Sequence, residues 1–130
     1  MKSRPRKNFQ APFNEWLGLR VRSRRREGVT VELEVRDELR NGLGVLHGGV
    51  TATLIDVAVG MAVWNHFQKR RKMVTVELKL NYFLPVAEGR VRARARLLRV
   101  GSSLVVGAVE VWTASRQLAA FGTATYKLLD

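Results

Sequence analysis

A run of turn residues stands directly before the longest apolar segment of the chain, and its glycines could take part in chemistry. Residues 41–49 read Asn-Gly-Leu-Gly-Val-Leu-His-Gly-Gly, so that Gly48 and Gly49 come at the expected start of a helix. A glycine pair in that place leaves backbone N–H groups uncovered, and together with the helix dipole these groups favour an anion or a developing oxyanion. Acyl transfer needs such donors because its tetrahedral intermediate carries negative charge on oxygen. A structural role, in which the glycines only permit a tight entry into the helix, is the open alternative.

One carboxylate lies inside the apolar segment. Asp56 is surrounded in sequence by Leu54, Ile55, Val57 and Ala58. A buried carboxylate without partners is strongly unfavourable, so such a group is either hydrogen-bonded for structural reasons or retained for chemistry. As a general base it would activate water, and as a nucleophile it would form an anhydride. The residue types leave these possibilities open.

The spacing of the two groups constrains how they could cooperate. Gly48 and Asp56 are eight residues apart, so in one helix their backbones lie about 12 Å apart along the axis. One small carbonyl group does not reach both within a single chain. If both act on one substrate, two antiparallel helices from two subunits must supply them. The catalytic hypothesis therefore predicts a homodimer with paired composite sites related by a two-fold axis.

The elements that must position these residues follow from hydrophobic periodicity. Residues 29–35 alternate apolar and polar side chains, as in a half-buried strand. Residues 50–66 predict a helix that is apolar on nearly all sides and therefore buried, and a short helix is predicted at 12–17. Strand-like segments with short, hairpin-type connections follow at 73–84, 89–100, 103–114 and 117–128. This order indicates an α+β fold in which the sheet curls around the long helix and leaves part of it for a partner subunit.

Length and composition limit the rest of the chain. The 130 residues suffice for one domain, which we place at 9–130 after a basic tail at 1–8 that is predicted to be disordered. Cysteine is absent and histidine occurs twice, so a thiol nucleophile is excluded and no metal site is expected. Neither a signal peptide nor an apolar run of about 20 residues is found, which predicts a cytoplasmic protein without a membrane partner. The formal net charge of +12 favours anionic partners.

Residues 41–56 together resemble a known family. The Asn-Gly-x-Gly-x-x-His-Gly-Gly run, with an Asp eight residues after the first glycine of the pair, is similar to the phenylacetate-pathway (PaaI-like) branch of hotdog-fold acyl-CoA thioesterases, and the similarity extends over about 29–128. It implies a hotdog fold, with an antiparallel five-stranded sheet wrapped around one long central helix. It also implies homodimers that often pair into homotetramers and that hydrolyse an aryl- or medium-chain acyl-CoA to free acid and CoA. CoA is then part of the substrate, and no cofactor is expected.

The resemblance assigns roles to five residues. The Gly48 N–H would polarise the thioester carbonyl, and Asn41 would hold the attacking water or the thioester end of the substrate. Asp56 of the partner subunit would act as general base or nucleophile, while His47 would order the loop. Thr75 matches the Ser or Thr that assists the acid in the family, although alternation places it on the opposite side of its strand from the neighbouring valines.

Binding of CoA needs basic residues for its phosphates and a channel for its pantetheine arm. The basic stretch at 68–72 is one candidate for the phosphates, and the turn at 99–103 resembles the nucleotide-contacting turn of the family. Residues 81–85 match a run along the pantetheine channel. The open alternative is that these three segments are ordinary solvent-exposed connections and strand ends without a role in binding. The expected substrate-binding residues are Gly49, Arg71, Tyr82, Phe83, Ser102 and Ser103.

Two other functions remain open. A hotdog dimer without catalysis could bind acyl-CoA, or nucleic acid through its Arg-rich surface, because the arginines at 20–26 and 90–96 are no part of the thioesterase pattern. Nucleic acid is disfavoured, since the sequence has no helix-turn-helix pattern and no interleaved aromatic residues of the kind that stack on single strands. A dehydratase of the same fold would need a histidine within the helix, whereas His66 lies near its end.

Overall fold

The computed structural model describes residues 11–25, 27–68 and 70–130, so the predicted tail at 1–8 lies outside the described residues. The short helix predicted at 12–17 is present, and it ends at Gly18 in the left-handed conformation with φ +79°. The predicted central helix begins two residues earlier than expected, at Gly48. The elements in chain order are α1 (Pro12–Leu17), β1 (Arg20–Arg25), β2 (Gly28–Glu34), the 3₁₀ turn η2 (Asp37–Leu39), α2 (Gly48–His66), β3 (Met73–Tyr82), β4 (Arg90–Val100), β5 (Leu104–Trp112) and β6 (Leu118–Leu128).

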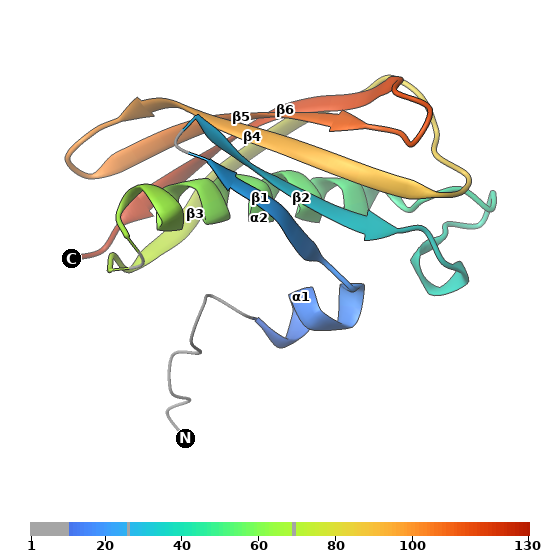
Figure 1. The fold of residues 1–130 in the computed structure, drawn as a ribbon, viewed down its shortest axis with the longest axis horizontal. Helices are drawn as coiled ribbons and strands as arrows, with labels where there is room; N and C mark the ends of the chain where they lie inside the picture. Colours follow the sequence, from blue (N-terminus) through green and yellow to red (C-terminus); the bar gives the residue numbers. More distant parts are fainter. Residues whose placement is uncertain (1–10, 26, 69) are drawn as a thin grey trace.

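The strands form one antiparallel sheet that arches over α2 (Figure 1), which confirms the predicted α+β hotdog arrangement. The strand order is β1-β2-β4-β5-β6-β3, so the sheet has six strands and the predicted number of five is wrong. The additional strand, β1, has the sequence Arg-Val-Arg-Ser-Arg-Arg and pairs with β2 alone. An edge strand with a single apolar side chain lacks the apolar alternation by which the other strands were identified.

The core lies between the concave face of the sheet and α2. Alternate side chains of β2, β4, β5 and β6 point to the helix and are buried, as the period of two requires. On α2 the side chains that pack against the sheet are fully buried. They are Leu54, Ile55, Ala58, Val59 and Val63.

One stripe of α2 is not covered by the sheet. Thr53, Asp56, Val57 and Trp64 follow each other at helical spacing and are only half-buried. In the described part of the chain, α2 is the one helix with the length and mean hydropathy of a membrane span, and half of it is buried inside the structure. A helix enclosed by its own sheet has the same composition, and its place in this fold identifies α2 as the core helix.

Strand β3 is the second edge of the sheet, and it presents apolar side chains to solvent. It pairs with β6 on one side, while Val74, Val76 and Leu78 are 45%, 51% and 37% exposed. An apolar edge strand with unpaired backbone groups is a surface on which another strand can add.

Candidate active site

A cavity of about 460 Å³ opens at the start of α2, and it brings together residues that the sequence analysis singled out. Its walls come from the loop before α2, the first turn of α2 and the segment that follows β3. Five of the predicted site residues line this cavity: Asn41, Gly48, Gly49, Tyr82 and Phe83.

The first turn of α2 leaves one backbone donor available to this cavity. His47 is the N-cap of the helix, and its Nδ1 accepts a hydrogen bond of 2.9 Å from the Gly49 N–H. The Val50 N–H bonds to the His47 carbonyl oxygen. Among the described residues, Gly48 has no acceptor for its N–H. The helix dipole and this N–H therefore both favour negative charge at one point of the cavity wall.

The loop before α2 is held by Asn41. Its side-chain oxygen accepts hydrogen bonds from the Leu43 and Val45 N–H groups at 3.0 and 3.2 Å, and its backbone N–H donates to the Val45 carbonyl at 2.8 Å. Gly44 closes the turn with a φ of +83°, a region that favours glycine. The amide oxygen of Asn41 therefore serves the loop, which leaves its amide N–H₂ group for a ligand in the cavity.

Tyr82 fastens the end of β3 to the start of α2. Its hydroxyl donates a hydrogen bond of 2.6 Å to the Gly48 carbonyl oxygen. A Cβ atom at Gly48 would lie 3.1 Å from this hydroxyl, which is a tight contact. More than half of the Tyr82 and Phe83 side chains is nevertheless exposed. They are aromatic surfaces beside the cavity, positioned to contact an elongated ligand.

The carboxylate of Asp56 lies two turns further along α2 and is held by two hydroxyl groups. Thr75 Oγ1 and Tyr126 Oη each approach Asp56 Oδ1 at 2.7 Å. Thr75 and Tyr126 stand directly opposite each other on β3 and β6. Among the described residues, Oδ2 of Asp56 accepts no hydrogen bond, so one carboxylate oxygen is fixed and the other is available.

Thr75 was predicted beside the acid, whereas Tyr126 was not. In sequence Tyr126 alternates with Ala124 and Leu128, which face the core, and it reads as an ordinary core aromatic residue. Burial raises the pKa of the Tyr126 hydroxyl above its usual range, and the negative charge of Asp56 adds to this effect. The hydroxyl therefore stays protonated and remains a donor at physiological pH.

The remaining predicted residues lie at the other end of the sheet. Arg71 pairs with Asp130 at 2.9 Å and stacks over the Phe67 ring, and its hydrogen bond lowers the pKa of the Asp130 carboxyl. The Leu128 N–H bonds to the Ser103 carbonyl at 2.8 Å, and the Leu129 N–H bonds to the Lys72 carbonyl at 3.0 Å. The last residues of the chain thus join the basic stretch at 70–72 to the turn that contains Ser102 and Ser103.

These groups are not assembled into one site within a single chain. The cavity lies at the first turn of α2, Asp56 lies eight residues further on, and the basic stretch follows the end of this 19-residue helix. At 1.5 Å per residue, these three places are spread over about 28 Å. The free backbone donor, the carboxylate and the basic stretch would become neighbours only if two chains combined.

The chain matches known proteins over most of its length. The family model described as "Thioesterase superfamily" matches residues 43–120. The medium/long-chain acyl-CoA thioesterase YigI of Salmonella typhimurium is 31% identical over 135 residues, which cover 91% of this chain and 86% of that protein. The structure of PA5202 from Pseudomonas aeruginosa has a TM-score of 0.86 and 36% identity, covering 92% and 95% of the two chains. The TT0310 protein of Thermus thermophilus has a TM-score of 0.83 and 31% identity, covering 92% and 99%.

Proposed function

Because the chain belongs to the thioesterase superfamily, we propose that it hydrolyses acyl-CoA to a free acid and CoA. The observation that carries this proposal is that each chain has two available groups. The Gly48 N–H in the cavity wall has no acceptor among the described residues, and the Asp56 carboxylate has one oxygen without a hydrogen bond. The first group would stabilise the oxyanion, and the second would act on water or on the carbonyl carbon. The motif at 41–49 with Asp56 supports the PaaI-like branch of the superfamily.

The functional unit of this proposal is a homodimer with its two sites at the interface. The uncovered stripe of α2 contains Asp56, and the exposed edge of β3 runs beside it. If β3 pairs with β3 of a second copy about a two-fold axis, the two α2 helices lie antiparallel. The carboxylate of one chain would then approach the Gly48 of the other. The basic stretch and the turn at 102–103 would reach the partner's cavity, where the CoA phosphates enter.

The chemical steps follow from these positions. The Gly48 N–H donates to the thioester oxygen as the carbonyl carbon becomes tetrahedral, and the amide of Asn41 holds the water or the thioester end. On the general-base route, Asp56 Oδ2 takes a proton from water while the water oxygen bonds to the carbonyl carbon. The C–S bond then breaks, and the CoA sulfur leaves as a thiolate that takes up a proton. On the nucleophile route, Oδ2 bonds to the carbonyl carbon and the C–S bond breaks, so that CoA leaves as a thiolate that takes up a proton. Water then cleaves the resulting anhydride to the free acid and the Asp56 carboxylate.

The acyl group is expected to be aryl or of medium length. Tyr82, Phe83, Leu84 and Val86 give the cavity an aromatic and apolar wall, and the relative YigI is named for medium- and long-chain acyl-CoA. Thiol release from a panel of short, medium, long and aryl acyl-CoA thioesters tests the proposal directly. Turnover that is fastest for medium or aryl chains is the expected result. A folded, dimeric protein that releases no thiol from any of them would contradict it.

Mixing two inactive variants tests the composite site. Asp56→Asn removes the acid from one chain, and Gly48→Pro removes the oxyanion donor from the other. After dissociation and random reassociation, half of the dimers are mixed, and each contains one intact site, so about a quarter of the wild-type activity should return. The measurement is thiol release before and after mixing. If both groups act from the same chain, every site keeps one defect and mixing restores nothing.

A further inference from the structure

A glycine in the interior of α2 has a specific neighbour. Gly60 lies in the middle of the helix, where glycine is less favourable than alanine by about 1 kcal/mol. A Cβ atom at this position would lie 2.6 Å from the Tyr126 hydroxyl oxygen and 3.0 Å from the ring carbon that bears it. The absence of a side chain at Gly60 therefore lets the Tyr126 ring lie against the helix backbone, one turn beyond Asp56.

This close approach determines what the Tyr126 hydroxyl can reach. The Tyr126 hydroxyl oxygen lies 2.7 Å from Asp56 Oδ1 and 2.8 Å from the Asp56 carbonyl oxygen. Tyr126 itself is only 5% exposed. Thr75 supplies a second hydroxyl to the same Oδ1 at 2.7 Å. Both donors approach one carboxylate oxygen, so the rotation of the carboxylate is restricted and Oδ2 is directed away from them.

We propose that Tyr126 is a positioning residue for the reacting carboxylate, and that Gly60 is glycine because Tyr126 needs its space. This inference rests on the proposed thioesterase function. Tyr126 acts through Asp56 and does not touch the substrate. Its hydrogen bond fixes the oxygen that does not react, so that the other oxygen faces the carbonyl carbon or the water with little rotational freedom.

Two substitutions and their combination test this inference. Tyr126→Phe keeps the ring and removes the hydroxyl, so kcat should fall about 10- to 100-fold while KM stays within about twofold. Gly60→Ala should lower kcat in the wild-type background, because the new methyl group displaces the hydroxyl. In the Tyr126→Phe background the same Gly60→Ala change should lower kcat much less, since the displaced group is absent. The readouts are kcat, KM and dimer content for all four proteins.

The outcomes separate this inference from the function on which it rests. Wild-type activity that depends on Asp56 but is unchanged in Tyr126→Phe would overturn the positioning role and leave the thioesterase intact. Equal losses from Gly60→Ala in both backgrounds would also overturn it, because the effect would then be general helix damage. A wild type without any thioesterase activity would instead contradict the proposed function.

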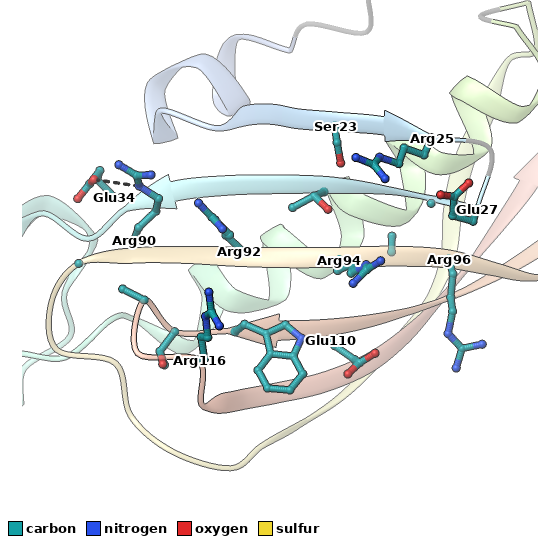
Figure 2. Close-up of a pocket in the computed structure, with 17 residues that line it drawn as sticks. Ser23, Arg25, Glu27, Glu34, Arg90, Arg92, Arg94, Arg96, Glu110 and Arg116 are labelled. Carbon is teal, nitrogen blue, oxygen red and sulfur yellow. Dashed lines mark ion pairs between the residues drawn. The ribbon is translucent and has the colours of Figure 1, made fainter.

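A second feature lies on the opposite, convex face of the sheet. A groove of about 1160 Å³ lies there, and among the described residues its lining includes six arginines and no lysine. Figure 2 draws these lining residues as sticks. The acidic residues in the lining are Glu27, Glu34 and Glu110. The arginines are Arg25, Arg90, Arg92, Arg94, Arg96 and Arg116.

Ion pairs compensate part of the positive charge at one end of this groove, where Glu32 also pairs with Arg22 at 3.5 Å. Arg90 and Arg92 pair with Glu32, at 3.9 and 3.0 Å, and Arg90 also pairs with Glu34 at 3.6 Å. Arg94, Arg96 and Arg116 form no ion pair with any carboxylate in the described part of the chain. Arg94 and Arg96 are neighbours on one face of β4, Glu110 stands opposite Arg94 on β5 without an ion pair to it, and Arg116 lies in the turn after β5. An anion in the groove would relieve the repulsion among these arginines.

The groove is separate from the candidate active site. Its lining shares no residue with the cavity at the start of α2, and the arginines of β4 point away from α2 while Val91, Ala93 and Ala95 between them pack toward it. If a second copy of the chain docked here through the same face, arginines would lie against arginines and repel each other. Among the described lining residues Trp112 is the one large apolar side chain, and it is half-buried, so the groove offers little apolar surface to a lipid bilayer.

We infer that this groove binds the phosphate backbone of nucleic acid without reading its sequence. Alternate residues of a strand are about 6.7 Å apart, so Arg90 to Arg96 extend over about 20 Å. Guanidinium groups bind phosphate with paired hydrogen bonds, and this row of arginines presents several guanidinium groups to one nucleic-acid strand. The sequence has no helix-turn-helix pattern and no interleaved stacking aromatics, which disfavours base-specific recognition. Neither feature is required for contacts with phosphates alone.

The test measures binding of a fluorescent 20-base-pair DNA duplex across a series of salt concentrations. Arg94→Gln/Arg96→Gln/Arg116→Gln should weaken binding about tenfold or more and reduce the salt slope by about 2 to 3. The matched control, Lys2→Gln/Arg4→Gln/Arg6→Gln, removes the same charge from the N-terminal segment and should keep the slope within about one unit of the wild type. Thiol release and folding should be unchanged in the groove variant.

Several outcomes would overturn the groove as a nucleic-acid site. A wild type that does not bind the duplex at low salt, or a groove variant that binds as the wild type does, contradicts it. So does loss of binding in the N-terminal variant alone. Vesicles with anionic lipid are the second probe, and binding to vesicles that exceeds binding to the duplex would assign the groove to a membrane surface instead.

Discussion

Asp56→Asn is expected to lower kcat for the best acyl-CoA substrate about 10²- to 10⁴-fold. The amide has the size of the carboxylate, and its oxygen can still accept the hydrogen bonds of Thr75 and Tyr126 that Asp56 Oδ1 receives. An amide cannot take a proton from water or attack the carbonyl carbon, so binding should persist while turnover is lost. Thiol release gives kcat and KM, and size-exclusion chromatography confirms that the variant still forms the wild-type assembly.

The matched control for this change is Asp37→Asn. Asp37 lies in the 3₁₀ turn, where its side chain is highly exposed and pairs with Arg40 at 3.5 Å. The Asp37→Asn substitution removes the same charge at a residue that does not line the cavity. The activity of this variant should therefore equal that of the wild type. Full activity of Asp56→Asn would refute the role of the acid. If activity is lost, a single turnover of the wild type in water enriched in oxygen-18 tests the nucleophile route, because label in Asp56 requires an anhydride that water attacks at the Asp56 side-chain carbon.

Gly48→Pro is expected to lower kcat about 10²- to 10³-fold, the usual effect of deleting one oxyanion donor. Proline has no backbone N–H, and it is well tolerated at the first position of a helix. His47, the residue before it, has a φ of −61° and a ψ of 133°, which is the extended conformation that precedes proline. The substitution therefore deletes the donor while α2 keeps its start. The readout is kcat with the best substrate, together with helix content from circular dichroism.

Gly48→Ala separates the lost donor from the added bulk. Both substitutions place a Cβ atom 3.1 Å from the Tyr82 hydroxyl, but alanine keeps the N–H. We expect Gly48→Ala to lose far less activity than Gly48→Pro. If the two variants lose the same activity, crowding at Tyr82 explains the effect, and the Gly48 N–H is not the oxyanion donor.

The strongly periodic elements were predicted from the sequence because their patterns are local. The alternation of Val29, Val31 and Leu33 marks β2. The largely apolar run after Gly49, interrupted by Thr51, Thr53 and Asp56, marks α2, because the pattern of neighbouring residues indicates whether one face or nearly all faces are buried. The glycine pair was likewise recognised from its place before the helix, and Asn41 from the resemblance of the motif to a known family. The structure gathers these residues with Tyr82 and Phe83 in one cavity. The roles assigned to these residues remain predictions for the experiments above.

Other features depend on which strand lies beside which, and no local pattern contains that information. β1 was missed because its pairing with β2, rather than its own composition, makes it a strand. Thr75 faces Asp56 because a bulge shifts the register of β3 against β6 between Thr75 and Glu77.

Tyr126 reaches Asp56 from a distance of 70 residues in sequence, through the space that Gly60 leaves open. Periodicity therefore predicted the elements, whereas residue types, their spacing and the resemblance to a known family predicted the residues of the motif. Long-range strand pairing and the packing of β6 on α2 decided which hydroxyls hold the acid and which backbone donor stays free.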